Sequence, residues 1–102
     1  MDAKGDCMIV SCQNIIENRH WTFCYALVSG QGKLLGQRIL HAWCELGDIV
    51  FDYSNGERIV MRKEIYYKMA KIKEEDITRQ TSEEVKKLMF KTKTYGGWIK
   101  NV

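Results

Sequence analysis

Three residues of this chain, Cys7, His41 and Asp52, belong to the types that together perform nucleophilic catalysis. A carboxylate beside a histidine fixes the tautomer and the orientation of the imidazole ring. The oriented ring can stabilise a cysteine thiolate and later deliver a proton to a leaving group. If the fold brings the three side chains together, they predict acyl transfer through a thioester. The reaction would be hydrolysis or transamidation of a peptide, isopeptide or other amide bond.

The cysteine is expected at the start of a helix. Asp6 or Gly5 can cap a helix that runs over about residues 7–18. The positive end of the helix dipole and the N–H groups of the first turn favour a thiolate, and they could supply part of an oxyanion hole. The apolar residues of this helix have helical spacing and predict one buried stripe: Met8, Ile9, Cys12, Ile15 and Ile16. Cys7 falls outside that stripe, in line with Ser11.

The histidine and the carboxylate belong to a predicted β-hairpin with Gly47-Asp48 as a two-residue turn. Counting back from this turn, Trp43 opposes Asp52. Opposed residues project to the same side of a sheet and side chains alternate along a strand, so His41, Trp43 and Glu45 share the face of Asp52. His41 is then a diagonal neighbour of Asp52, close enough for a hydrogen bond. A three-residue turn would reverse this result.

Two neighbours on the same face are given different roles. Trp43 is the candidate for the wall of a substrate cleft beside His41, although a tryptophan on a sheet face can equally be a core residue. Glu45 lies near the turn, so we expect it to be exposed to solvent.

A zinc site would use His20, Cys24, His41 and Cys44, but their H-x3-C and H-x2-C spacings match no standard zinc pairing. His41 and Cys44 are three residues apart on a strand, so they point to opposite faces. We therefore expect no metal and no cofactor. His20 is expected at the surface, and Cys24 and Cys44 in the core.

Beyond the first helix and the hairpin, further elements must hold these residues in place. In chain order the predicted elements are strands at 21–28, 37–46 and 49–53, a turn at 54–56, a helix at 62–70, a short strand at 76–80 and a last helix. Thr81 followed by Glu84 has capping-box spacing and begins that helix. In Tyr95-Gly96-Gly97-Trp98 the glycines are expected to end it, and the two aromatic residues to pack back on the body. The order predicts an α+β domain in which an antiparallel sheet packs against the N-terminal and C-terminal helices.

Composition limits the class of protein. With 102 residues, 45% of them hydrophobic and 28% charged, the chain suits one globular domain over residues 1–102. There is neither an apolar run long enough to span a membrane nor a signal-peptide pattern, so we expect a cytoplasmic protein with four free thiols and no membrane partner. The net charge of +3 is mild, and the lysines near the C-terminus are typical of a solvated helix face. A basic nucleic-acid accessory protein is the weakest alternative.

The order of these motifs resembles the papain-like and transglutaminase-like cysteine peptidase superfamily, in particular its short bacterial, archaeal and phage members. The resemblance rests on a cysteine at a helix start, the run His41-Ala42-Trp43-Cys44-Glu45 on a strand and a hairpin that ends at Asp52. It extends over about residues 6–98. It implies a minimal core of that fold, with Cys7 as the nucleophile, His41 as the base and Asp52 as the orienting acid.

The C-terminal half of the chain adds to the resemblance, since Thr81-x-x-Glu84 and the ending Tyr95-Gly96-Gly97-Trp98 are also similar to those members. One feature departs from it. Larger papain-like enzymes carry a glutamine before the cysteine that completes the oxyanion hole, and none of the residues before Cys7 is a glutamine. In this chain Ser11 or backbone N–H groups would complete the oxyanion hole instead.

The chain also lacks the extra subdomain that walls a substrate cleft, so a partner protein or a second copy of the chain is expected to complete one. Two functions follow from the sequence. The first is a cysteine hydrolase or acyl-transferase acting on a peptide or amide substrate. The second is a catalytically silent binding or regulatory domain of the same fold.

Overall fold

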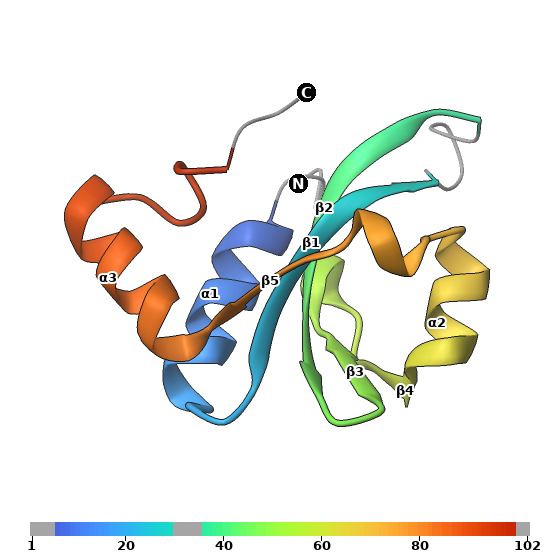
Figure 1. The fold of residues 1–102 in the computed structure, drawn as a ribbon, viewed down its shortest axis with the longest axis horizontal. Helices are drawn as coiled ribbons and strands as arrows, with labels where there is room; N and C mark the ends of the chain where they lie inside the picture. Colours follow the sequence, from blue (N-terminus) through green and yellow to red (C-terminus); the bar gives the residue numbers. More distant parts are fainter. Residues whose placement is uncertain (1–5, 30–35, 100–102) are drawn as a thin grey trace.

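The structure is a computed structural model that describes residues 6–29 and 36–99. Its elements follow in chain order in Figure 1: α1 (Cys7–Glu17), β1 (Thr22–Ser29), β2 (Arg38–Leu46), β3 (Ile49–Asp52), the 3-10 helix η2 (Ser54–Gly56), β4 (Ile59–Arg62), α2 (Lys63–Ala70), the 3-10 helix η3 (Glu74–Asp76), β5 (Thr78–Thr81) and α3 (Ser82–Thr92). The predicted α+β class, with an antiparallel sheet and helices from both ends of the chain, is confirmed. Gly5, one of the two predicted helix caps, lies outside the described residues.

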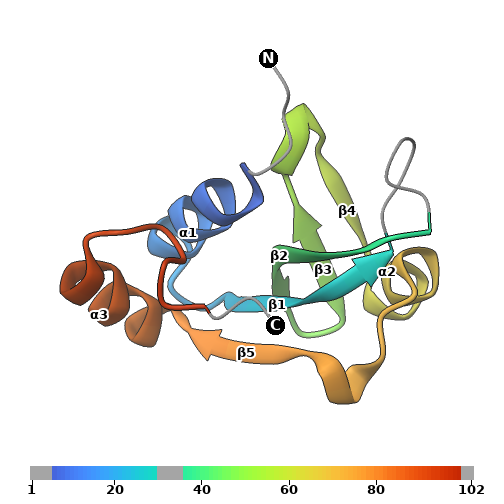
Figure 2. The same cartoon turned by 90° about the horizontal axis from the view of Figure 1, so that it is seen from above.

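All five strands form one antiparallel sheet in the order β4-β3-β2-β1-β5. β2 lies at its centre, between β3 and β1, and β1 also pairs with the edge strand β5. β2 and β3 pair only close to their turn, from Leu46 opposite Ile49 to Cys44 opposite Phe51. Farther from the turn, β3 and β4 rise away from β2 toward the start of α1 (Figure 2). This divergence brings the end of β3 close to the helix that carries Cys7.

Helices cover both faces of the sheet, α1 and α3 on one side and α2 on the other (Figures 1 and 2). The core is therefore divided into two clusters, because β1 and β2 carry apolar side chains on both faces. The cluster under α1 and α3 contains Cys7, Cys12, Ile15, Phe23, Ala42, Cys44 and Val85. The cluster under α2 contains Cys24, Ala26, Val28, Trp43, Val50, Tyr66 and Ile72.

The buried side of α1 differs from the predicted stripe. Cys7 and Ser11 are buried, whereas Ile9 is 43% exposed and Ile16 39% exposed. The small side chains Ala42 and Cys44 on β2 explain the difference, because they let the Cys7–Ser11 side of the helix approach the strand closely. The thiol of Cys44 donates a hydrogen bond to the carbonyl oxygen of Ser11 at 3.5 Å. Packing of small residues, rather than the number of isoleucines, decides which side faces inward.

The sequence did not predict the edge strand β4, which pairs with β3 from Ile49 opposite Arg62 to Asp52 opposite Ile59. It follows the predicted turn after two residues and continues directly into α2, so no loop composition marks its C-terminal end. Val60 is 54% exposed, as expected where one face of an edge strand meets solvent.

The start of α3 is confirmed and its end is not. Thr81 accepts a hydrogen bond from the backbone N–H of Glu84 at 3.1 Å, and the Glu84 carboxylate accepts from the N–H of Thr81 at 2.8 Å. The helix ends at Thr92, and its C-cap residue Lys93 adopts the left-handed conformation with φ 58, before the glycines are reached. Trp98 packs back on the body and donates to Gln80 at 3.1 Å, but Tyr95 is 45% exposed.

Candidate active site

His41 and Asp52 meet as the hairpin count predicts. The turn is two residues long, with Gly47 at φ 58 and Asp48 outside the positive-φ region, as in a type II′ turn. The Nε2 atom of His41 lies 2.8 Å from Oδ2 of Asp52. Both side chains are largely enclosed, with exposed fractions of 14% and 7%.

Four hydrogen bonds hold the Asp52 carboxylate. Oδ1 accepts from the hydroxyl of Ser54 at 2.7 Å and from its backbone N–H at 3.2 Å. Oδ2 accepts from His41 and also from the hydroxyl of Tyr66 at 2.7 Å. Burial would raise the pKa of Asp52, but the hydrogen bonds and the positive charge of His41 lower it to about 2. Asp52 is therefore an ionised, oriented acceptor at neutral pH.

The loop that follows Asp52 also anchors the helix that carries Cys7. The backbone N–H of Asn55, in η2, donates to Oδ1 of Asp6 at 2.8 Å. Asp6 is the N-cap residue of α1, directly before Cys7. Asn55 adopts φ 57, a conformation that asparagine tolerates better than most residues. The position of Cys7 is thus tied to the same short segment that positions Asp52.

Cys7 lies close enough to His41 to help raise the pKa of its ring. Burial alone would lower the pKa of His41, but its hydrogen bonds to Asp52 and to Cys7, and the charges of both groups, raise it to about 9. Because Nε2 is engaged by Asp52, Nδ1 is the ring nitrogen that remains for a second partner. An imidazolium that persists at neutral pH beside a cysteine is the partner that a thiolate needs.

Trp43 occupies a different place from the one expected for a cleft wall. It is fully buried in the cluster under α2, so it does not line an open cleft. Its ring instead packs against His41, with centroids 6.2 Å apart and planes at 22°, and against Tyr66 at 5.5 Å. Its Nε1 donates to Glu45 at 2.9 Å. Trp43 therefore supports the histidine from the core side.

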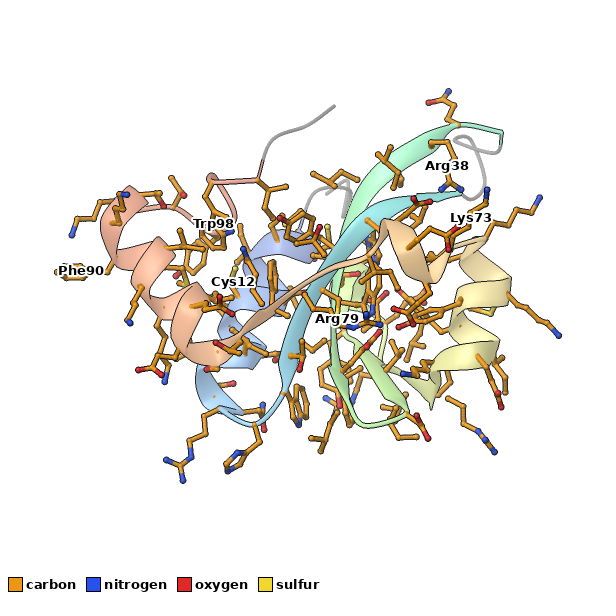
Figure 3. The ribbon with its side chains drawn as sticks, in the orientation of Figure 1. Cys12, Arg38, Lys73, Arg79, Phe90 and Trp98 are labelled. Carbon is orange, nitrogen blue, oxygen red and sulfur yellow. The ribbon has the colours of Figure 1, made fainter. Side chains whose placement is uncertain are left out.

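Glu45 is buried, at 4% exposure, and the expectation that it faces solvent is wrong. Its carboxylate accepts from Trp43, from the hydroxyl of Tyr67 and from Nε of Arg79 at 3.2 Å. Arg79 also binds Glu74 at 2.5 Å, and in Figure 3 its side chain lies between β5 and the α2 side of the sheet. The buried carboxylate of Glu45, the partly exposed Arg79 and Tyr67 thus link β2 to β5 and α2. The face parity already placed Glu45 inward, and that signal should have outweighed its nearness to the turn.

Ser54 and Tyr66 are contacts of the site that sequence reasoning missed. A serine two residues after an aspartate is a common partner in a side-chain turn, so Ser54 carried a local signal. Tyr66 carried no such signal, because nothing near it in sequence points to Asp52, and α2 and β3 meet only in the folded chain.

The other cysteines belong to the core. Burial raises the pKa of Cys12 and of Cys44 to about 12, and it raises the pKa of Cys24 as well. Cys44 faces Ser11, on the side of β2 opposite to His41. Within residues 6–29 and 36–99, no group of three or more histidine, cysteine, aspartate or glutamate side chains is placed to hold a metal ion. His20 is exposed, as predicted.

Comparison with known proteins returns no match among protein-family models, curated proteins or solved structures. The similarity to the papain-like and transglutaminase-like superfamily therefore stays a prediction from the sequence motifs. No helix in the described part of the chain is long and apolar enough to cross a membrane.

Proposed function

We propose that this chain is a cysteine hydrolase or acyl-transferase that cleaves an amide bond, in a peptide or an isopeptide, through a thioester at Cys7. One observation carries the proposal: His41 binds Asp52 through Nε2 at 2.8 Å, and Cys7 lies close enough to help raise the pKa of the same ring. The predicted resemblance to papain-like and transglutaminase-like peptidases agrees with this chemistry. All four cysteines are free thiols, which suits a reducing compartment such as the cytoplasm.

In the first half of the reaction, the Cys7 thiolate attacks the carbonyl carbon of the substrate and a C–S bond forms. The tetrahedral intermediate then collapses, the C–N bond breaks, and the His41 imidazolium gives its proton to the departing amine. Asp52 keeps the ring in one orientation throughout and stabilises its charged form. The N–H groups of the first turn of α1 are the available donors for the intermediate's oxygen.

In the second half, neutral His41 takes a proton from the acceptor as the acceptor attacks the thioester carbonyl. The C–S bond breaks, and the thiolate–imidazolium pair is restored. Water as the acceptor gives hydrolysis, and an amine gives transamidation. The peptide or amide substrate would sit on a surface that a partner protein or a second copy of the chain extends.

A second candidate is a catalytically silent binding or regulatory domain of the same fold. The observation that favours it is the burial of the site, since Cys7 is only 7% exposed and the His41 side chain is 14% exposed. A large substrate must displace part of that cover to reach the sulfur. The two candidates therefore differ in the reactivity and the accessibility of one thiol.

Alkylation with iodoacetamide separates them. The rate at each cysteine is measured by mass-spectrometric peptide mapping from about pH 5 to about pH 9. Near pH 6 we expect Cys7 to react about tenfold or more faster than glutathione, because the His41 imidazolium beside it would stabilise the attacking sulfur anion. The three core cysteines, with raised pKa values, serve as internal controls.

Two variants complete the experiment. His41→Ala is expected to abolish the advantage of Cys7, whereas His20→Ala, at the exposed second histidine, leaves it unchanged. Incubation with p-nitrophenyl acetate should leave an acetyl group on Cys7, and Cys7→Ser should remove the rapid release of nitrophenol. Ordinary thiol reactivity at Cys7 that does not respond to His41→Ala would exclude the enzyme and leave the binding domain.

A further inference from the structure

Tyr66 donates to the same carboxylate oxygen that His41 uses. Its hydroxyl lies 2.7 Å from Oδ2 of Asp52, and Nε2 of His41 lies 2.8 Å from that atom. The other oxygen, Oδ1, is occupied by two hydrogen bonds from Ser54. Two donors from different elements, α2 and β2, therefore share one acceptor atom, while Ser54 fixes the rotation of the carboxylate.

Packing alone does not explain the hydroxyl. The Tyr66 ring is 3% exposed and lies against Trp43, a position that a phenylalanine ring would fill equally well. The neighbouring Tyr67 has the same side chain and also packs on Trp43, but its hydroxyl binds Glu45. The two adjacent tyrosines thus differ in which buried carboxylate they contact, and only Tyr66 reaches the candidate active site.

We propose that Tyr66 is a positioning residue of this site, whose hydroxyl shares Oδ2 of Asp52 with His41 and thereby weakens the hold of the carboxylate on the imidazolium. A histidine paired with an unshared carboxylate would keep its proton too firmly to pass it to a leaving amine. Tyr66 draws part of the negative charge of Asp52 into a second hydrogen bond and leaves His41 a better acid. The catalytic meaning of this inference rests on the proposed function, but the coupling between the two side chains does not.

In the described part of the chain, three cysteines are the other titratable groups that interact with this contact. Cys7 from α1 acts on both His41 and Tyr66, Cys24 from β1 acts on Tyr66, and Asp52 acts on Cys44 from β2. Burial first, and then the charge of Asp52 and the hydrogen bond to it, raise the pKa of Tyr66 above its ordinary value. Tyr66 is therefore a neutral donor throughout the pH range in which His41 titrates, and its hydroxyl proton is always present to compete.

The test is the titration of His41 followed by NMR at the ring Hε1 proton, in the unmutated chain, in Tyr66→Phe and in Tyr67→Phe. We expect Tyr66→Phe to move the midpoint of His41 upward by about half a pH unit or more, because a hydrogen bond to a charged group is being removed from the shared oxygen. Tyr67→Phe, the matched control, should leave the midpoint unchanged. An unchanged or lowered midpoint in Tyr66→Phe, or an equal shift in both variants, would overturn the inference.

A measurement on the unmutated chain covers the case in which Tyr66→Phe does not fold. The hydroxyl proton of Tyr66 is followed by NMR through the His41 titration. When His41 loses its charge it becomes a weaker donor to Oδ2, so the Tyr66 hydrogen bond should strengthen and its proton should move downfield. A hydroxyl resonance that does not respond to the titration of His41 contradicts the shared-acceptor arrangement.

Failure of this inference is distinguishable from failure of the proposed function. Rapid alkylation of Cys7 together with an unshifted His41 midpoint in Tyr66→Phe overturns the role of Tyr66 and leaves the enzyme intact. A shifted His41 midpoint in Tyr66→Phe together with slow alkylation of Cys7 supports the coupling between Tyr66 and His41. It excludes a role of that coupling in catalysis.

Discussion

Replacing His41 with glutamine should change how the stability of this protein depends on pH. The pKa of His41 rises from 6.5 to about 9 on folding, because its contacts with Asp52 and Cys7 outweigh the cost of burial. The folded state therefore holds a proton on His41 that the unfolded chain has already lost between these two pH values. The stabilisation is complete below pH 6.5 and declines as pH rises through about 9.

The magnitude follows from the width of that interval. Each pH unit between the two pKa values changes the free energy of unfolding by about 1.4 kcal/mol. Over the interval from 6.5 to about 9, the His41 contribution should thus fall by about 3 kcal/mol. Asp52 contributes in the opposite direction, because its pKa falls from 3.8 to about 2, so its share is present above pH 3.8 and is lost only in strong acid. The pair is therefore most stabilising between about pH 4 and about pH 6.5.

Urea unfolding of the reduced protein, followed by tryptophan fluorescence, measures this effect at a series of pH values. The informative quantity is the difference in free energy of unfolding between the unmutated chain and His41→Gln. Glutamine keeps an N–H donor near Asp52 but carries no titratable proton, and effects common to both chains, such as ionisation of unfolded thiols, cancel in the difference. His20→Gln at the exposed histidine is the matched control, and should follow the unmutated chain at every pH.

The expected difference is largest near pH 6 and declines steadily toward pH 9. A difference that stays constant over this range would show that His41 titrates equally in the folded and unfolded chains. That result would refute the ion pair as the cause of the raised pKa, even if the two side chains are as close as 2.8 Å.

Two further predictions concern the neighbouring carboxylates. Asp52→Asn removes the larger of the two contributions that offset burial and leaves only that of Cys7, so the pKa of His41 should fall well below about 9, and an NMR titration that still gives a midpoint near 9 would contradict this. Glu45→Gln removes the buried charge opposite Arg79 and should lower the free energy of unfolding by about 2 kcal/mol in urea melts. A change below about 0.5 kcal/mol would mean that the pair contributes specificity rather than stability.

The meeting of His41 and Asp52 was predictable because it depends on local geometry. A two-residue turn fixes the register of the hairpin, and the alternation of side chains then fixes the face. The cap of α3 was predictable for the same reason, since Thr81 and Glu84 satisfy one another within a single turn. Both features require only residues close together in sequence.

The surroundings of the site were not predictable in this way, because they come from distant parts of the chain. Glu45 is buried because Arg79 arrives on β5, and β5 pairs with β1 rather than with a strand next to it in sequence. Tyr66 reaches Asp52 only because α2 crosses the face of the sheet on which Asp52 lies. Sequence patterns indicate which face a side chain takes, but not which strand or helix will cover that face.

The burial of Cys7 was also not predictable from the sequence of its own helix. The sequence placed Cys7 outside the apolar stripe of α1, yet the small residues Ala42 and Cys44 let that side of the helix pack on β2. The close approach encloses the sulfur, and together with the link between Asp6 and Asn55 it brings the start of the helix to His41. A fully exposed cysteine could not make this contact, because the ring of His41 is itself largely buried. The enclosure that restricts access to the thiol is therefore also what gives it a charged histidine as a partner, and reactivity and accessibility at Cys7 have to be measured separately.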